Sequence, residues 1–294
     1  MRFLIILLAC LIRRQLDARR KLDCHSALRK LFARLGANHP SPGWGWGIMA
    51  IILALGALVW VGDYVISHNA LFFLWAPVEL LVLVALMGNP GWHGTLRAYA
   101  ESWLRGDAQA AWHHVRHLLP PERQGEAISP EKLHVILASR LLVTAFEGYF
   151  LMIFWYALLG PAGALVVRLA MGVRDHWPAA TVRATFAGFC EVLAWIPVRL
   201  LSTTFGLAGD FSGWLHYRRS QGAMAREAPE TVLFGAANGA LSSFSLEPKR
   251  FAERHPEEWP EFGRRSMLAV RDLLNRSMMV WIALFALLAI GGWL

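Results

Sequence analysis

The stretch "GIMAIILALGALVWVGDYVI", residues 47 to 66, is almost wholly apolar. A helix needs about 20 apolar residues to cross a bilayer core of about 30 Å, so a run of this length predicts a transmembrane helix. Similar windows follow along the chain, and the one that begins at residue 186 is the least apolar. These windows cover residues 70–88, 141–159, 186–209 and 277–294.

The composition of the whole chain agrees with these windows. Hydrophobic side chains make up 56% of the 294 residues and charged ones 17%, and the mean hydropathy is +0.39. Soluble domains hold about 45–50% apolar and about 25% charged residues. The sequence therefore predicts an all-α, polytopic integral membrane protein with about four to five transmembrane helices plus amphipathic cytoplasmic helices, in a single membrane domain over residues 1–294.

The positions of the basic residues decide how the net charge of +8 is interpreted. They gather before the first strong span, as the positive-inside rule requires of a cytoplasmic segment. The partner that this indicates is the lipid bilayer with its anionic cytoplasmic leaflet, and no nucleic acid is expected. The N-terminal cluster consists of Arg13, Arg14, Arg19, Arg20, Lys21, Arg29, Lys30 and Arg34.

The distribution of charge also predicts where the segments between the spans lie relative to the membrane. Residues 1–45 are predicted to form a basic cytoplasmic or interfacial segment, in which "MRFLIILLACLIRR" is a short helix in the membrane rather than a cleaved leader. The loop 89–139 and the segment 210–276 are expected in the cytoplasm, and residues 277–294 form the C-terminal transmembrane helix. The threading of residues 141–209 stays open.

An amphipathic helix is predicted within the first cytoplasmic loop. Apolar residues recur at three- and four-residue spacing from 95 to 119, and Pro120-Pro121 ends the pattern. The polar face carries His113 and His117 one turn apart, a spacing that could ligate a metal. No carboxylate or thiol lies near them in the sequence, so we interpret "HHVRH" as a solvated basic face.

Several nucleotide-binding and catalytic motifs are absent from the sequence. It contains no Gly-Lys dipeptide, which excludes a Walker A phosphate loop, and neither G-x-S-x-G nor H-E-x-x-H. Cys10, Cys24 and Cys190 have no C-x-x-C spacing, so neither a disulfide framework nor a zinc site is expected. We therefore assign no metal, no cofactor and no catalytic residue.

The most informative residues are charged side chains inside the apolar windows. Each costs about 2.5–3.5 kcal/mol at the centre of a membrane helix, so we expect them to face the interior and pair. A proline in the same helix as two of them removes a backbone donor and frees carbonyl groups. Two interpretations stay open: buried locks between helices, or a ligand pocket. The predicted pocket residues are Glu79, Glu147, Arg168, Glu191, Pro197 and Arg199.

Two blocks of sequence resemble a known superfamily. "WYALLGPAGALVVRLA" (155–170) followed by "EVLAWIPVRLL" (191–201) resembles diagnostic blocks of the CobD/CbiB superfamily, membrane proteins related to adenosylcobinamide-phosphate synthase. "LRGDAQAAWHHV" (104–115) and "PETVLFGAANGAL" (229–241) look like weaker blocks in the same order. In the last block, the four-residue spacing of two glycines, Gly235 and Gly239, predicts a close contact with another helix.

Within that superfamily the chain looks more like the AmpE branch. That branch is described as inner-membrane proteins tied to β-lactamase induction and encoded beside a cytosolic muropeptide amidase. The resemblance implies a regulatory or signalling protein of the bacterial inner membrane, multi-pass and with a cytoplasmic N-terminus. Its small ligand would be a muropeptide or a corrinoid-like molecule, and any protein partner is unidentified.

Matching residues to the synthases one at a time supports a non-enzymatic role. Arg168 and Arg199 fall on synthase arginines, and Glu191 falls on the second of two paired acids. Cys190 replaces the first of those acids, and Ala194 replaces an asparagine. The alternative is a CbiB-like, ATP-dependent amide synthase in cobalamin biosynthesis, which needs groups that hold phosphates and metal.

Overall fold

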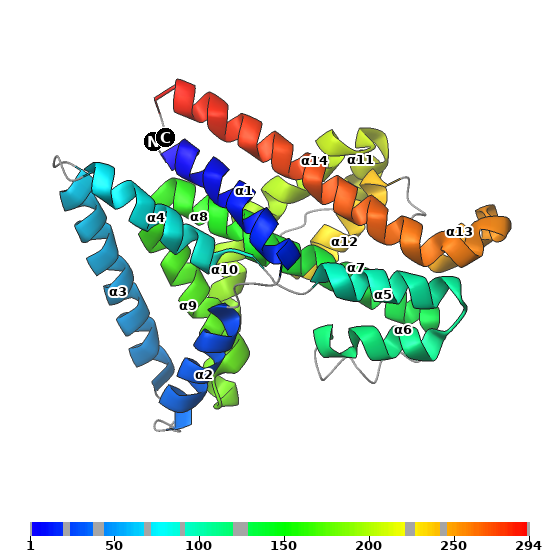
Figure 1. Cartoon of the computed structure of the whole chain (residues 1–294), viewed down its shortest axis with the longest axis horizontal. Helices are drawn as coiled ribbons and strands as arrows, with labels where there is room; N and C mark the ends of the chain where they lie inside the picture. The colour runs from blue at the N-terminus through cyan, green and yellow to red at the C-terminus, as the bar shows by residue number, and fades with distance from the viewer. Residues whose placement is uncertain are drawn as a thin grey trace. The chain divides into compact units, whose positions relative to one another are not determined.

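The computed structural model describes residues 2–19, 24–37, 44–67, 72–88, 92–119, 129–220, 227–241 and 246–292. Within these ranges every regular element is helical (Figure 1). The chain divides into two compact units. The first comprises Met1–Pro90, Glu147–Pro197 and Leu284–Leu294, and the second comprises Gly91–Phe146 and Val198–Ala283.

Among the described residues, four helices are long and apolar enough to cross a membrane, and a shorter apolar helix, Trp75–Leu86, accompanies them. Many exposed side chains in the apolar stretches of these helices are large and apolar, as expected of side chains that face acyl chains rather than water. Leu58, Val192 and Ile290, for example, are 69%, 71% and 84% exposed. The predicted all-α polytopic membrane protein is confirmed. The four long helices are Trp44–Ile66, Pro130–Leu159, Ala180–Ala208 and Pro256–Ile290.

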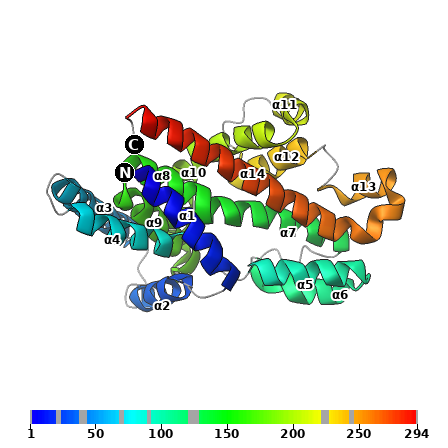
Figure 2. The same ribbon diagram turned by 45° about the horizontal axis from the view of Figure 1, so that its top comes forward.

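The first unit is built around α9 (Pro161–His176), which contacts α2, α3, α4 and α8. Helix α1 packs on α4 and α8. Figures 1 and 2 both show α3 and α4 beside each other in this unit. The surrounding helices are α1 (Arg2–Arg19), α2 (Cys24–Ala37), α3 (Trp44–Ser67), α4 (Phe72–Leu86) and α8 (Leu151–Leu159).

The second unit holds two helix pairs around α7 (Pro130–Ala145), namely α5 with α6 and α11 with α12. Helix α7 continues through a π-helical turn, Phe146–Phe150, into α8, so the third long helix begins before the predicted window. Residues of α10 (Ala180–Ala208) and α14 (Phe262–Ile290) belong partly to each unit. The remaining elements are α5 (Trp92–Leu104), α6 (Ala108–Val115), α11 (Phe211–Ser220), α12 (Pro229–Ala240), α13 (Pro248–Arg254) and the 3-10 helix η4 (Pro256–Glu261).

A single amphipathic helix over 95–119 was the wrong expectation. The chain turns between α5 and α6, where Gly106 adopts a φ of +72°, a conformation that side chains with a Cβ rarely adopt. Asp107 then caps α6, because its Oδ1 accepts a hydrogen bond from the Ala110 amide at 2.8 Å. Much of the apolar stripe is buried, including Tyr99 and Val115, although Leu104 is 50% exposed. Pro120 and Pro121 lie outside the described residues.

The predicted close contact of Gly235 and Gly239 is confirmed. A Cβ added to Gly235 would lie 2.3 Å from the Tyr217 ring, and one on Gly239 would lie 3.0 Å from the Gly213 carbonyl oxygen. Helix α12 therefore packs against α11 through glycine.

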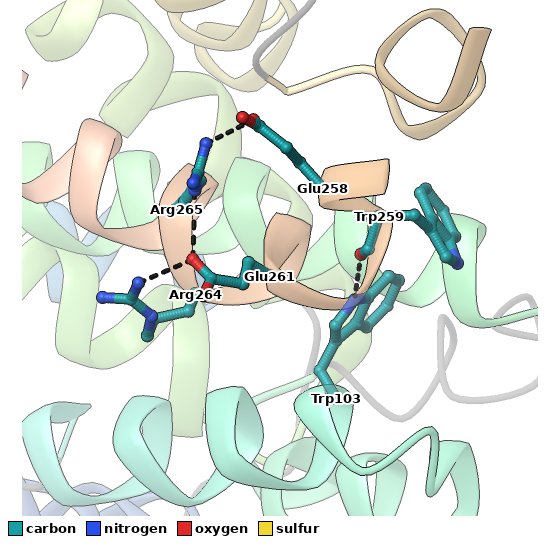
Figure 3. A network of polar contacts seen from close by, with 6 residues as sticks. All are labelled: Trp103, Glu258, Trp259, Glu261, Arg264 and Arg265. Atoms are coloured by element: carbon teal, nitrogen blue, oxygen red, sulfur yellow. Dashed lines mark hydrogen bonds and ion pairs between the residues drawn. The ribbon is translucent and has the colours of Figure 1, made fainter. Parts of the chain in front are cut away.

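Polar contacts join α5 to η4 and α14 in the second unit (Figure 3). The Trp103 indole donates to the Trp259 carbonyl at 3.5 Å, and the start of α14 carries exposed ion pairs such as Arg264 with Glu261 at 2.8 Å. Nearby, the buried His134 ring lies between the Tyr99 hydroxyl, 2.8 Å away, and the Ser266 hydroxyl, 2.6 Å away. Three helices are thus tied together at this end of the second unit.

Candidate functional site

Two of the buried acids in the first unit face donors from neighbouring helices. Glu79 of α4 accepts a hydrogen bond from the Tyr156 hydroxyl at 2.6 Å. Asp63 of α3 accepts one from the Trp75 indole at 3.0 Å and forms a longer ion pair with Arg2 at 3.4 Å. Each carboxylate is only 4% exposed. These contacts satisfy the pairing that a charged residue in a membrane span requires.

Glu147 also has a specific partner. Arg174 donates to both of its carboxylate oxygens, at 2.7 and 3.1 Å, and binds Asp175 with the same guanidinium. A bidentate arrangement of this kind is among the stronger polar contacts in proteins. Glu147 is therefore held by α9, the helix that also carries the buried Arg168.

The remaining predicted residues lie on α10. Glu191 is exposed in the described structure, which differs from the expected interior position, because it lies on the same face as the exposed Val192 and Trp195. Pro197 is buried and Arg199 is half-buried. That all six predicted residues line one ligand pocket stays a prediction.

Pro197 explains one polar contact that sequence reasoning did not foresee. Without an N–H, the proline cannot bond to the carbonyl four residues earlier, that of Leu193. The Trp155 indole donates to this carbonyl at 3.1 Å. The freed carbonyl therefore binds a tryptophan of α8 within the first unit.

A cavity of about 630 Å³ lies in the second unit, between α7, α11 and α12. Its volume is in the usual range for small-molecule sites, about 300–1,000 Å³. The lining is rich in polar side chains. They include Ser139, His216, Tyr217, Glu230, Asn238 and Glu247.

Two carboxylates border this cavity, and Arg250 lines it as well. Glu230 accepts a hydrogen bond from Ser139 at 2.8 Å, and Glu247 accepts one from Asn238 at 2.7 Å and pairs with Arg250 at 2.9 Å. Asn238 is only 8% exposed, and its amide oxygen accepts no hydrogen bond from the described residues. A carboxylate can accept about four hydrogen bonds, so two carboxylates and the Asn238 amide oxygen give this cavity a lining that suits a ligand that donates.

Tyr217 adds a hydroxyl that stays protonated. Burial, together with the charge of Glu227, raises the pKa of Tyr217 to about 12. Its hydroxyl donates to the Thr231 carbonyl at 3.4 Å. At neutral pH this side chain therefore closes the wall between α11 and α12 as a neutral group.

The sequence did not lead us to predict this cavity, although the segment that forms one wall had drawn attention for its glycines. Glu230 and Asn238 are eight residues apart on α12, about 80° around the helix and so on one side of it. Two polar residues at this spacing among small and apolar ones were the available signal. The glycines drew attention to helix packing instead.

Comparison with known proteins supports one superfamily. The chain is 25% identical to a cobalamin biosynthesis protein CobD of Stutzerimonas stutzeri over 246 residues, covering 74% of the chain and 79% of that protein. It is 26% identical to a cobalamin biosynthesis protein CobD of Chromobacterium violaceum over 256 residues, covering 81% of the chain and 78% of that protein. No family model and no solved structure match the chain. The two similarities support the CobD/CbiB superfamily.

Proposed function

We propose that this membrane protein, as a relative of the CobD/CbiB proteins, acts in cobalamin biosynthesis by joining an amine to a carboxylate. The observation that carries the proposal is the similarity to two CobD proteins over 74% and 81% of the chain. The comparisons favour this function over the regulatory one that the sequence motifs led us to expect.

The cavity of the second unit supports the proposal because it suits an amine. An ammonium group offers three N–H donors and no acceptor, which complements Glu230, Glu247 and the amide oxygen of Asn238. An ammonium group must lose a proton before it can act as a nucleophile. Glu230 would accept that proton, since its carboxylate is positioned by Ser139 at 2.8 Å.

Amide formation in this superfamily also implies ATP and a metal ion. Among the residues that the structure describes, no group of three or more His, Cys, Asp or Glu side chains is placed to hold a metal ion. We therefore derive no step through a metal–nucleotide complex.

A second candidate is a regulatory protein of the AmpE type, linked to β-lactamase induction and cell-wall recycling. Specific observations favour it: Cys190 and Ala194 stand where the synthases have an acid and an asparagine, and Glu147 is engaged by Arg174. In this role the same cavity would bind a muropeptide, which also carries an amine, and no chemistry would follow. A bacterial inner-membrane location with a cytoplasmic N-terminus is part of either proposal.

Genetic complementation separates the two candidates. The chain is expressed in a bacterium that lacks its own CobD protein and needs cobalamin to grow. We expect growth with the wild type and with Glu253→Gln, an exposed acid outside the cavity, and no growth with Glu230→Gln.

Absence of growth with a wild type that is folded and inserted in the membrane would refute the synthase proposal. The regulatory candidate then predicts a change in β-lactamase induction when the gene is deleted from a bacterium with an inducible enzyme. Unchanged induction would refute that candidate as well.

A further inference from the structure

We propose that α2 is a docking surface for anionic phospholipid headgroups at the edge of the membrane. The proposal does not depend on the function of the cavity. It rests on how α2 is attached to the first unit, which side chains it leaves exposed, and where it lies along the spans.

One face of α2 is fixed to the protein. The Phe32 ring is buried so closely against α9 that a Cβ on Gly172 would lie 2.4 Å from it. A Cβ on Gly36, one turn later, would lie 2.2 Å from the Pro178 ring. Helix α2 is thus a packed element of the unit, and its outward faces are set by this contact.

The outward faces separate charge from apolar surface. Lys30 and Arg34 are exposed and lie about 40° apart around the helix. Leu31 and Leu35 form a second stripe about 100° further round, and they are 48% and 45% exposed. A helix with one cationic stripe beside one leucine stripe suits the boundary between headgroups and acyl chains.

The position of α2 in the unit agrees with that boundary. Pro178, which Gly36 touches, lies two residues before α10 begins. Gly45, at the start of α3, lies beside Thr185 near the start of α10, with 3.7 Å from a Cβ to the hydroxyl oxygen. The last turn of α2 therefore lies at the end of the unit where α3 and α10 begin, beside α9 (Figures 1 and 2). Trp46, in the first turn of α3, is 77% exposed and has an aromatic side chain of the kind that favours the headgroup level.

The charge at this end is positive. Helix α2 contains no acidic residue, and Asp175 of α9 is already engaged by Arg174. Burial lowers the pKa of His176. The neighbouring Arg29 charge lowers this pKa further, whereas the Asp175 charge raises it. The leucine stripe favours a lipid over a soluble anion, because a lipid has acyl chains that can cover the exposed leucines and a free phosphate has none.

Lipid retention by the full chain tests the proposal. The protein is purified in neutral detergent and incubated with phosphatidylglycerol or phosphatidylcholine, and bound lipids are counted by native mass spectrometry. Each cation near an anionic surface contributes about fivefold to binding, so Lys30→Gln with Arg34→Gln should weaken phosphatidylglycerol retention roughly 25-fold. Phosphatidylcholine retention should not change.

Two controls keep the outcome decisive. Arg219→Gln with Lys249→Gln removes the same charge from exposed positions of the second unit and should change retention less than about twofold. Leu31→Ser with Leu35→Ser should weaken retention of both lipids. All substituted side chains are exposed, so the folded state is kept, and high salt should reduce the wild-type preference without any mutation.

Equal retention of the two lipids by the wild type would refute the proposal. So would an equal loss in the control pair, or displacement of phosphatidylglycerol by glycerol phosphate at the same concentration, which would mark a site for soluble anions.

Discussion

The acidic residues of the two units have different surroundings. In the first, Asp17, Asp63, Glu79 and Glu147 each accept a hydrogen bond from another helical element and so act as locks between helices; the donors are Tyr149, Trp75, Tyr156 and Arg174. In the second, Glu230 and Glu247 also have protein partners, but they border a cavity of about 630 Å³. A charged residue in a membrane protein is therefore not by itself evidence of a ligand site. What distinguishes the two cases is space beside the carboxylate.

The largest expected effect concerns a lock in the first unit. Arg13 is 1% exposed, pairs with Asp17 at 2.8 Å and donates to the Val84 carbonyl at 3.2 Å. Arg13→Ala leaves a buried carboxylate without this cation, which costs about 3–5 kcal/mol in the free energy of unfolding. Arg14→Ala, at the exposed neighbouring position, should cost less than about 0.5 kcal/mol. Melting temperatures in detergent measure both, and similar values would show that Arg13 is no lock.

The next effect concerns the cavity. Ethanolamine, used as a simple amine probe, should raise the melting temperature of the wild type, because a ligand that binds only the folded state stabilises it. Hydrogen bonds to charged groups contribute about 1.5–3 kcal/mol, so Glu230→Gln should weaken binding about 10- to 100-fold. Ethylene glycol, which lacks the ammonium group, should give no shift. If both probes shift the wild type equally, the cavity does not select amines.

A smaller effect is expected where α11 meets α12. A Cβ on Gly213 would lie 2.3 Å from the Gly239 carbonyl oxygen, so Gly213→Ala should cost about 1–3 kcal/mol through overpacking. Gly188→Ala on α10 is the matched control, since nothing lies within 4 Å of its Cβ position, and helix propensity should stabilise it by up to about 1 kcal/mol. Chemical denaturation measures the free energy of unfolding of both variants. A change of the same sign in the two variants would contradict the close packing of Gly213 against α12.

The smallest effect concerns the carbonyl that Pro197 leaves free. Trp155→Phe removes its donor and should cost about 1 kcal/mol. In a Pro197→Ala background the helix supplies its own N–H to Leu193, so the same tryptophan change should cost less. A double-mutant cycle on melting temperatures measures the difference, and additive effects would show that the indole and the proline are independent.

Much of the fold could be predicted from the sequence because apolar length and helical period are local properties. The windows at 47–66, 186–209 and 277–294 all lie within or overlap long helices of the structure. The break at Gly106 was missed because the apolar pattern continues on both sides of it. The spacing of apolar residues indicates which face of a helix is buried, but it does not indicate where the backbone turns.

The site was harder to predict for a physical reason. Glu147 could be recognised as unusual in a span, but its partner, Arg174, is 27 residues away in the sequence and is brought close only by packing. The cavity depends on α7 meeting α11 and α12, which lie much later in the chain. Glu191 was expected inside and is exposed, because hydrophobicity alone does not tell which face of an apolar helix meets its neighbours.

The contact between Trp155 and the Leu193 carbonyl predicts the order in which two positions can change during evolution. A descendant that loses Pro197 regains a hydrogen bond within α10 and no longer needs an indole on α8, whereas one that loses Trp155 first carries a bare carbonyl in the membrane. Substitution at position 197 should therefore come before substitution at position 155. Related proteins are expected to keep the proline and the tryptophan together, or to have lost the tryptophan only where the proline is already gone.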